Sequence, residues 1–344
     1  MSWRRSKLVH DAVRYTVAFA LSLGIVSQVR REVRLPAGGI PGVFAAPGTV
    51  TGSRVSVRDS AGGEVDAKRT AAADVRQTVG EAQRGFLGFD TNVYPGDEAM
   101  QKWKESSPYQ WVGYYLPAPC HKDDSWSGTR ERLERMGWGI AVIYVGQQVW
   151  SGIPRTPGIQ YITRRVRAGG TKRKPRYRTV REARRVPISD CSAARISAAQ
   201  GRLEADDAIA RTAAEGFPRG TVIYLDLERV EVMPQLYRDY YKAWADRVIE
   251  DGRYHVGSYA HSHNANVIYE DLKQVLTARG VTEEPHMWVA KGRGFHPAAI
   301  PEEVGHAFAM AWQGVLDVTR RYAGIKLPID ENVSDRPNPS APID

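Results

Sequence analysis

The 344-residue chain contains only two cysteines, Cys120 and Cys191, and no apolar run long enough to span a bilayer. Two cysteines allow one intrachain disulfide, which suits an exported protein, and we expect them to pair. The uncharged stretch 15–29 is shorter than the roughly 20 residues of a membrane span but fits the apolar part of an export signal. Basic residues at positions 4, 5 and 7 precede it.

We therefore expect residues 1–30 to be an export signal or, if it stays uncleaved, a membrane anchor. A buried N-terminal helix is the alternative. Residues 31–83 are rich in Gly, Ala, Val, Arg and Ser with weak periodicity, which predicts a linker or flexible tail. The protein would then be secreted or held in the cell envelope.

Outside one segment, the chain also lacks excess positive charge. The net charge is +9, but residues 155–185 hold 12 Lys and Arg against one acid, Glu182, so this segment alone carries +11 and the rest −2. We interpret residues 150–198 as an insertion, with its basic part a solvated, partly disordered loop. The functional alternative is binding of an anionic polymer, a phosphate-rich wall polymer or nucleic acid, with Tyr161 and Tyr177 among the charges.

No glycine-rich phosphate loop follows the first predicted strand, which disfavours an open nucleotide-binding sheet. Apolar strands alternate instead with helices, as in a parallel sheet covered on both faces. The predicted strands are 86–90, 110–115, 139–145, 221–228, 254–259, 286–290, 307–313 and 325–329. Eight such strands over residues 84–333 predict an α/β protein with a closed (β/α)8 TIM-type barrel, irregular in its last third. Residues 334–344 would be a C-terminal tail.

The strand 221–228 ends in two carboxylates, Asp226 and Glu228. Residues two apart in a strand share a face, so both would lie on the side opposite Leu225 and Leu227. A structural alternative is that Glu228 caps the next helix and Asp226 pairs with an arginine. Further polar residues fall near the ends of other predicted strands: Asp90, Gln313 and Asp330. In a barrel these ends meet at one face, where active sites lie.

Two stretches carry a family resemblance: Gly88-Phe89-Asp90-Thr91, and residues 205–228 with their Tyr-x-Asp-x-Glu strand. Both resemble the glycoside-hydrolase-like domain of actinobacterial secreted proteins, formerly of unknown function, which is similar to the family 25 lysozymes. The ending Ala311-Trp312-Gln313 with Ile329-Asp330 is similar to the lysozyme ending. The resemblance implies a barrel that acts on cell-wall glycan, most of all peptidoglycan, without a cofactor. A non-catalytic carbohydrate or cell-wall binder on the same barrel is the alternative.

The resemblance assigns Glu228 as general acid, with Asp226, Asp90 and Asp330 as acidic positions around it and Gln313 as a polar wall residue. A like charge on Asp226 would raise the pKa of Glu228, and Asp226 or Asp90 would steady positive charge on the sugar or orient water. Four aromatic residues are candidates for stacking on sugar rings: Tyr114, Tyr224, Tyr259 and Trp288. The rival metal site would use His261 and His263 with Asp90 and Asp226, although our expectation is no metal.

Overall fold

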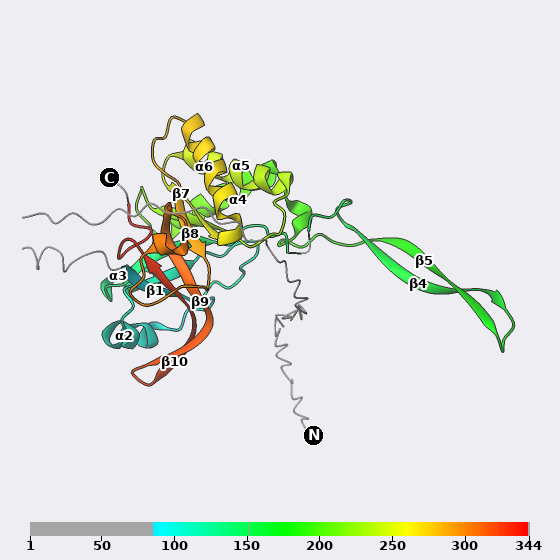
Figure 1. Cartoon of the computed structure of the whole chain (residues 1–344), viewed down its shortest axis with the longest axis horizontal. Coiled ribbons are helices and arrows are strands. Elements are labelled where there is room, and N and C mark those ends of the chain that lie inside the picture. Colours follow the sequence, from blue (N-terminus) through cyan, green and yellow to red (C-terminus); the bar gives the residue numbers. More distant parts are fainter. Residues whose placement is uncertain (1–84, 151, 343–344) are drawn as a thin grey trace, which may run out of the picture. The chain divides into compact units, whose positions relative to one another are not determined.

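A computed structural model describes residues 85–150 and 152–342. Eight strands form a closed barrel in the order β1-β10-β9-β8-β7-β6-β3-β2, which confirms the predicted barrel (Figure 1). They are β1 (Phe86–Asp90), β2 (Trp111–Tyr115), β3 (Gly139–Tyr144), β6 (Val222–Leu227), β7 (His255–His261), β8 (His286–Ala290), β9 (Ala309–Tyr322) and β10 (Ile325–Ser334). The predicted export segment and linker lie outside the described residues.

The last strand departs from a regular (β/α)8 barrel. β10 runs antiparallel to both of its neighbours, β9 and β1, whereas the other seven strands are parallel. A hairpin turn at Ala323 and Gly324, both with positive φ, reverses the chain between β9 and β10. The register of β10 places Asp330 directly opposite Asp90. The predicted irregularity of the last third is therefore a reversed closing strand.

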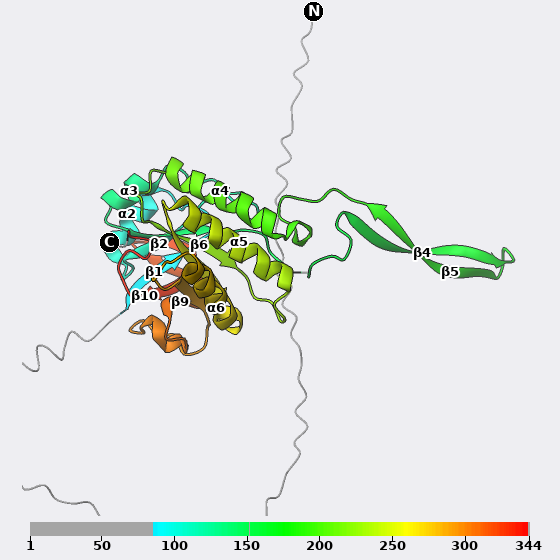
Figure 2. The same cartoon turned by 90° about the horizontal axis from the view of Figure 1, so that it is seen from above.

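Helices cover the barrel unevenly. Three helices have 17 residues: α4 (Ala198–Ala214), α5 (Gln235–Asp251) and α6 (Ser262–Ala278). Two are shorter, the 10-residue α2 (Asp97–Ser106) and the six-residue α3 (Arg130–Arg135). Figure 2 shows α4, α5 and α6 side by side. The buried face of α5 carries aromatic side chains, which include Tyr237, Tyr240 and Trp244. Within the described residues, no helix is both long and apolar enough for a bilayer span.

The segment after β10 is part of the barrel, although the sequence suggested only a tail. β3 and β6 pair directly over just three positions, from Val142 opposite Ile223 to Tyr144 opposite Leu225. Ser340 fills the gap beneath them. Its amide donates to the Ile140 carbonyl (2.9 Å), and its hydroxyl donates to the Val222 carbonyl (2.7 Å). The same hydroxyl accepts the Val142 amide (2.8 Å), so Ser340 bridges the two strands.

The basic segment is an ordered hairpin, so the prediction of a partly disordered loop was wrong. β4 (Ile159–Gly170) and β5 (Pro175–Arg185) form a separate two-stranded antiparallel sheet, drawn in Figure 1 as a long twisted ribbon. Threonine, tyrosine, valine and isoleucine are interspersed with arginine along both strands, which favours extended backbone. Charged side chains on both faces keep the hairpin exposed along nearly all of its length.

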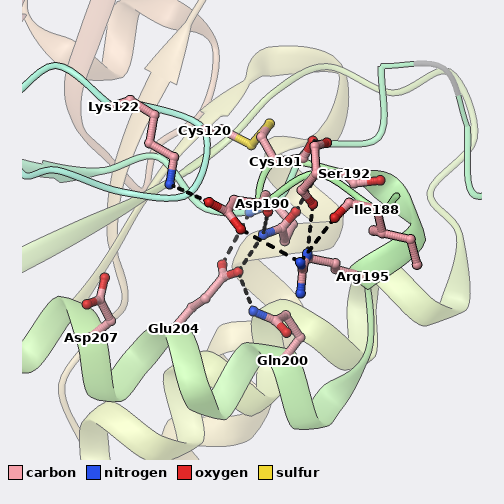
Figure 3. Close-up of polar contacts among 12 residues, drawn as sticks. Cys120, Lys122, Ile188, Asp190, Cys191, Ser192, Arg195, Gln200, Glu204 and Asp207 are labelled. Atoms are coloured by element: carbon pink, nitrogen blue, oxygen red, sulfur yellow. Dashed lines mark hydrogen bonds and ion pairs between the residues drawn. A yellow bond between two sulfur atoms is a disulfide. The ribbon is translucent and has the colours of Figure 1, made fainter. Parts of the chain in front are cut away.

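A disulfide joins the base of this insertion to the barrel. Cys120, in the loop after β2, is bonded to Cys191, in the loop before α4, with their Cα atoms 4.7 Å apart. The predicted pairing is thus confirmed. Polar contacts surround the bridge (Figure 3): Lys122 lies 3.3 Å from the carboxylate of Asp190, and Arg195 donates to the carbonyl of Ile188 at 3.3 Å.

Candidate active site

Four carboxyl groups gather at the end of the barrel where the parallel strands finish. Asp90 is the last residue of β1, Asp226 lies one residue before the end of β6, and Glu228 follows that strand. Asp330 joins them because the antiparallel β10 places it opposite Asp90. The sequence-based grouping of these four residues agrees with this placement.

Asp90 is the centre of a hydrogen-bonded network. Its carboxylate accepts the Tyr115 hydroxyl at 2.7 Å and the side-chain amides of Asn332 at 2.8 Å and Gln313 at 3.0 Å. Three neutral donors hold this carboxylate in one orientation. An acid so held can face a developing positive charge without rearranging.

Gln313 connects Asp90 with the next carboxylate. The Gln313 side-chain nitrogen donates to Asp90 and also to Asp330, at 3.2 Å. Its oxygen accepts the Tyr259 hydroxyl at 2.6 Å, which determines which end of the amide faces the acids. Asp330 in turn accepts the backbone amide of Asp317 at 2.6 Å. Gln313 is therefore a wall residue of the site, and Tyr259 positions it.

Burial raises the pKa of every carboxyl group in the cluster, and neighbouring carboxylates add to the rise at Asp226, Glu228 and Asp330. The pKa of Asp330 is raised to about 8, first by burial and then by the charge of Asp90. Burial also raises the pKa of Asp90, although the hydrogen bonds from Tyr115, Asn332 and Gln313 oppose it. Burial likewise raises the pKa of Glu228, and the charge of Asp90 raises it further. Carboxylic acids kept protonated near neutral pH can act as proton donors.

Asp226 and Glu228 repel each other when both are ionised. Burial raises the pKa of Asp226 well above its usual range, and the charges of Glu228 and Asp90 raise it further. One oxygen of Asp226 is enclosed and has no hydrogen-bond partner among the described residues. The sequence predicted the same repulsion as a rise in the pKa of Glu228, and the pKa of Glu228 is raised. Because the two charges repel each other, the pair loses its protons in two steps that belong to both groups together.

Gln148, which the sequence analysis missed, holds the backbone that carries this pair. Its side-chain nitrogen donates to the Asp226 carbonyl at 2.9 Å, and its oxygen accepts the Glu228 amide at 3.2 Å. The Tyr237 hydroxyl of α5 donates to the same oxygen at 3.2 Å. The available signal was a glutamine pair, residues 147–148, just beyond the apolar third strand.

The four residues predicted to stack on sugar rings lie in different parts of the structure. Tyr259 is half-buried at the site, as described. Tyr114 lies on the opposite side of β2, where its hydroxyl bonds Glu215 at 2.5 Å and its ring packs on Phe217. Its assignment as a sugar-binding residue was wrong, because alternation along β2 turns Tyr115, not Tyr114, toward Asp90.

Tyr224 and Trp288 face the barrel interior but lie within its core. Each is 1% exposed, and their rings pack edge to face at 5.7 Å. The Tyr224 hydroxyl donates to the Pro339 carbonyl (3.2 Å), and the Trp288 indole donates to Asn332 (3.1 Å). Neither ring has a free face for a sugar, so both assignments were wrong. Trp288 contributes indirectly, because it orients the Asn332 that bonds Asp90.

An exposed aromatic residue stands near the site instead. Trp150, in the loop after β3, is 66% exposed. It borders a cavity of about 370 Å³ that Gln148, Cys191 and Ser192 also line. The sequence shows Trp150 only as the residue before the basic insertion, and nothing in its neighbourhood predicts exposure.

The two histidines of the rival metal site are engaged elsewhere. The His261 ring accepts the backbone amide of His263 at 3.0 Å, and the His263 ring lies 3.2 Å from the Glu231 carbonyl. In the part of the chain that the structure describes, no group of three or more His, Cys, Asp or Glu side chains is arranged to hold a metal ion.

Replacing Asp330 by asparagine should reduce the loss of stability at alkaline pH. Its folded-state pKa of about 8 exceeds the roughly 3.9 of an unfolded Asp, so the folded state binds more protons between these values and its stability falls as pH rises. We expect the free energy of unfolding to fall less between pH 5 and pH 8 in Asp330→Asn than in wild type, by on the order of 2 kcal/mol. Urea unfolding at the two pH values measures this difference. The exposed Asp124→Asn is the control, and an equal pH dependence in wild type and Asp330→Asn would contradict the shift.

Comparison with known proteins places the chain in a described family. Residues 101–334 match the family described as Rv2525c-like, glycoside hydrolase-like domain. This match includes Asp226, Glu228, Gln313 and Asp330, whereas Asp90 precedes it. No curated protein matches the chain.

Solved structures are similar to the chain at low sequence identity. The Tat-secreted protein Rv2525c of Mycobacterium tuberculosis, in complex with L-tartrate, is 15% identical with a TM-score of 0.38, and the match covers 72% of this chain and 94% of that one. The Clostridium perfringens spore cortex lytic enzyme SleM is 12% identical with a TM-score of 0.43, covering 73% and 67%. The Streptococcus pneumoniae glycosyl hydrolase 25 GHIP is 12% identical with a TM-score of 0.41, covering 72% and 86%.

Proposed function

Because the chain belongs to the Rv2525c-like family of glycoside hydrolase-like domains, we propose that it is an exported protein that hydrolyses cell-wall glycan, with peptidoglycan as its substrate. The observation that carries the proposal is the cluster of four carboxyl groups with raised pKa at one end of the barrel, of which Asp90 is buried and the other three are partly buried. Glycosidic hydrolysis needs both a protonated and an ionised carboxyl group at the scissile bond.

In this mechanism Glu228 donates a proton to the leaving oxygen. Glu228 lies beyond the end of β6, whereas Asp226 precedes it with one oxygen enclosed. The two groups share one proton until the second ionisation of the pair, so Glu228 can still be protonated after the first proton has left. Asp90, whose three donors favour its ionised form, would steady positive charge on the sugar.

The proposal is tested by incubating the purified protein with cell walls, following turbidity and identifying released muropeptides, with and without a metal chelator. Release of muropeptides that the chelator leaves unchanged supports carboxylate hydrolysis. Release that the chelator abolishes supports the metal-dependent rival. Binding of walls without release, lost when Glu228 and Asp90 are changed, would replace the hydrolase proposal by the binding-protein alternative.

Asp226→Asn should move the alkaline limb of the pH–rate profile to lower pH. A general acid works only while protonated, so activity is lost as pH rises through the highest pKa of the acid pair. The substitution removes that upper step and leaves Glu228 to titrate alone, with a pKa raised only by burial and Asp90. Profiles of kcat/KM against pH check this. An unchanged alkaline limb would show that Asp226 does not share the acid proton.

A further inference from the structure

The basic hairpin has two chemically different faces. Residues directly opposite in an antiparallel pair share a face, and the register pairs Arg165 with Thr179 and Arg167 with Tyr177. We call this side the arginine–tyrosine face; it comprises Tyr161, Thr163, Arg165, Arg167, Tyr177, Thr179, Arg181 and Arg185. The opposite face comprises Ile162, Arg164, Val166, Arg176, Arg178, Val180, Glu182 and Arg184. Each face therefore carries four arginines.

Stacking holds two arginines of the arginine–tyrosine face in place. The Arg165 guanidinium lies 4.5 Å from the centre of the Tyr177 ring, and that of Arg181 lies 4.1 Å from the Tyr161 ring. Both tyrosines are about half exposed, at 48% and 49%. A guanidinium stacked on a ring loses less freedom when it binds a ligand, because its plane is already held.

The acid of the hairpin lies on the opposite face. Glu182 accepts Arg164 there at 3.0 Å. Among the residues that the structure describes, no carboxylate lies within ion-pair distance of the four arginines of the arginine–tyrosine face. These guanidinium groups can therefore meet an external anion without breaking an internal ion pair.

We propose that the arginine–tyrosine face binds a phosphodiester-linked polymer of sugar or polyol units. A planar guanidinium presents two parallel N–H donors that match two phosphate oxygens. Arginines two residues apart on one strand are about 6.6 Å apart, so one polymer chain can cross several of them. The surface lies outside the barrel and adds a second binding site to the proposed hydrolase.

Two other polyanions fit this face less well. Single-stranded nucleic acid is bound through base stacking on free aromatic faces, but here guanidinium groups cover Tyr161 and Tyr177. A lipid surface would engage apolar side chains, and those of the middle of the hairpin, Ile162, Val166 and Val180, lie on the opposite face.

The test compares two triple variants of the full chain that remove equal charge from the two faces. Poly(glycerol phosphate) is the probe, because it has phosphodiesters without bases and no glycosidic bond in its backbone for the barrel to cleave. We expect R165Q/R167Q/R181Q to weaken binding about 100-fold and to reduce the salt slope by about 2. The matched R176Q/R178Q/R184Q variant should lose less than about fivefold. Thermal unfolding confirms that both variants fold.

Equal losses in the two variants would overturn the proposal in favour of unspecific charge attraction. Stronger binding of a (dT)20 oligonucleotide than of poly(glycerol phosphate) of equal charge would assign the face to nucleic acid instead. Binding of phosphatidylglycerol vesicles that depends on Ile162 and Val180 rather than on Arg165 and Arg181 would assign the hairpin to membranes. No result here depends on glycan cleavage, so failure of the hydrolase proposal leaves this test intact.

Discussion

Glu228→Gln is expected to lower kcat for glycan cleavage by about 10²- to 10⁴-fold, the usual cost of losing a general acid. Glutamine has nearly the shape of glutamic acid, but its amide cannot supply the proton. KM should therefore change little, and the loss should appear in kcat.

The matched control is Glu231→Gln, three residues along the chain. Glu231 is exposed and lies 2.8 Å from Arg229, so the variant loses the same charge next to the site. Muropeptide release by wild type, Glu228→Gln and Glu231→Gln is compared at the optimum pH. Full kcat in Glu228→Gln would end its assignment as the acid and direct attention to Asp226.

Removal of the disulfide should produce the largest change in stability. Cys120 and Cys191 are 71 residues apart, and a cross-link over such a loop restricts the unfolded chain by about 4 kcal/mol. We expect the double variant Cys120→Ser, Cys191→Ser to lose about 4 kcal/mol in free energy of unfolding and to melt roughly 10 °C lower. Denaturant titration with and without reductant measures the change.

Noncovalent contacts at the bridge should keep the double variant folded. Gln147 donates to the Asp190 carbonyl at 2.7 Å and accepts the Ser192 amide at 2.7 Å, and neither bond involves sulfur. Reductant should destabilise wild type to the level of the variant and leave the variant unchanged. Two free thiols in the folded, non-reduced protein would contradict the pairing.

The sequence was sufficient to predict the barrel and the acids, because both depend on short-range patterns. The apolar run of eight residues that ends in Asp226 and Glu228 indicates by itself a buried strand, and its alternation shows which residues share a face. The sequence did not show which side chains of β2 face the barrel interior, because Tyr114 and Tyr115 are both aromatic and either could point inward. The bond from Tyr115 to Asp90 settles that phase, and it spans two strands.

Depth within the barrel could not be predicted either. Tyr224 shares a face with Asp226, but one layer nearer the start of the strand, where Trp288 and Pro339 enclose it. The direction of β10 depends on the turn at Ala323 and Gly324, while its apolar pattern fits a strand of either direction. The hairpin was not predicted because its many charged residues indicated a loop, although strand-forming residues such as Val166 and Val180 lie among them.

Ser340 and β10 also determine when the protein can fold during synthesis. β1 pairs with β10 from Phe86 opposite Ser334, and Ser340 bridges β3 and β6. Contacts so distant in sequence make folding slow and leave strand edges unpaired until β10 and Ser340 have been synthesised. Asp90 and Asp330 meet only when β10 has paired with β1. A nascent chain released before β10 has been synthesised would therefore hold most of the barrel's strands but no assembled carboxyl cluster.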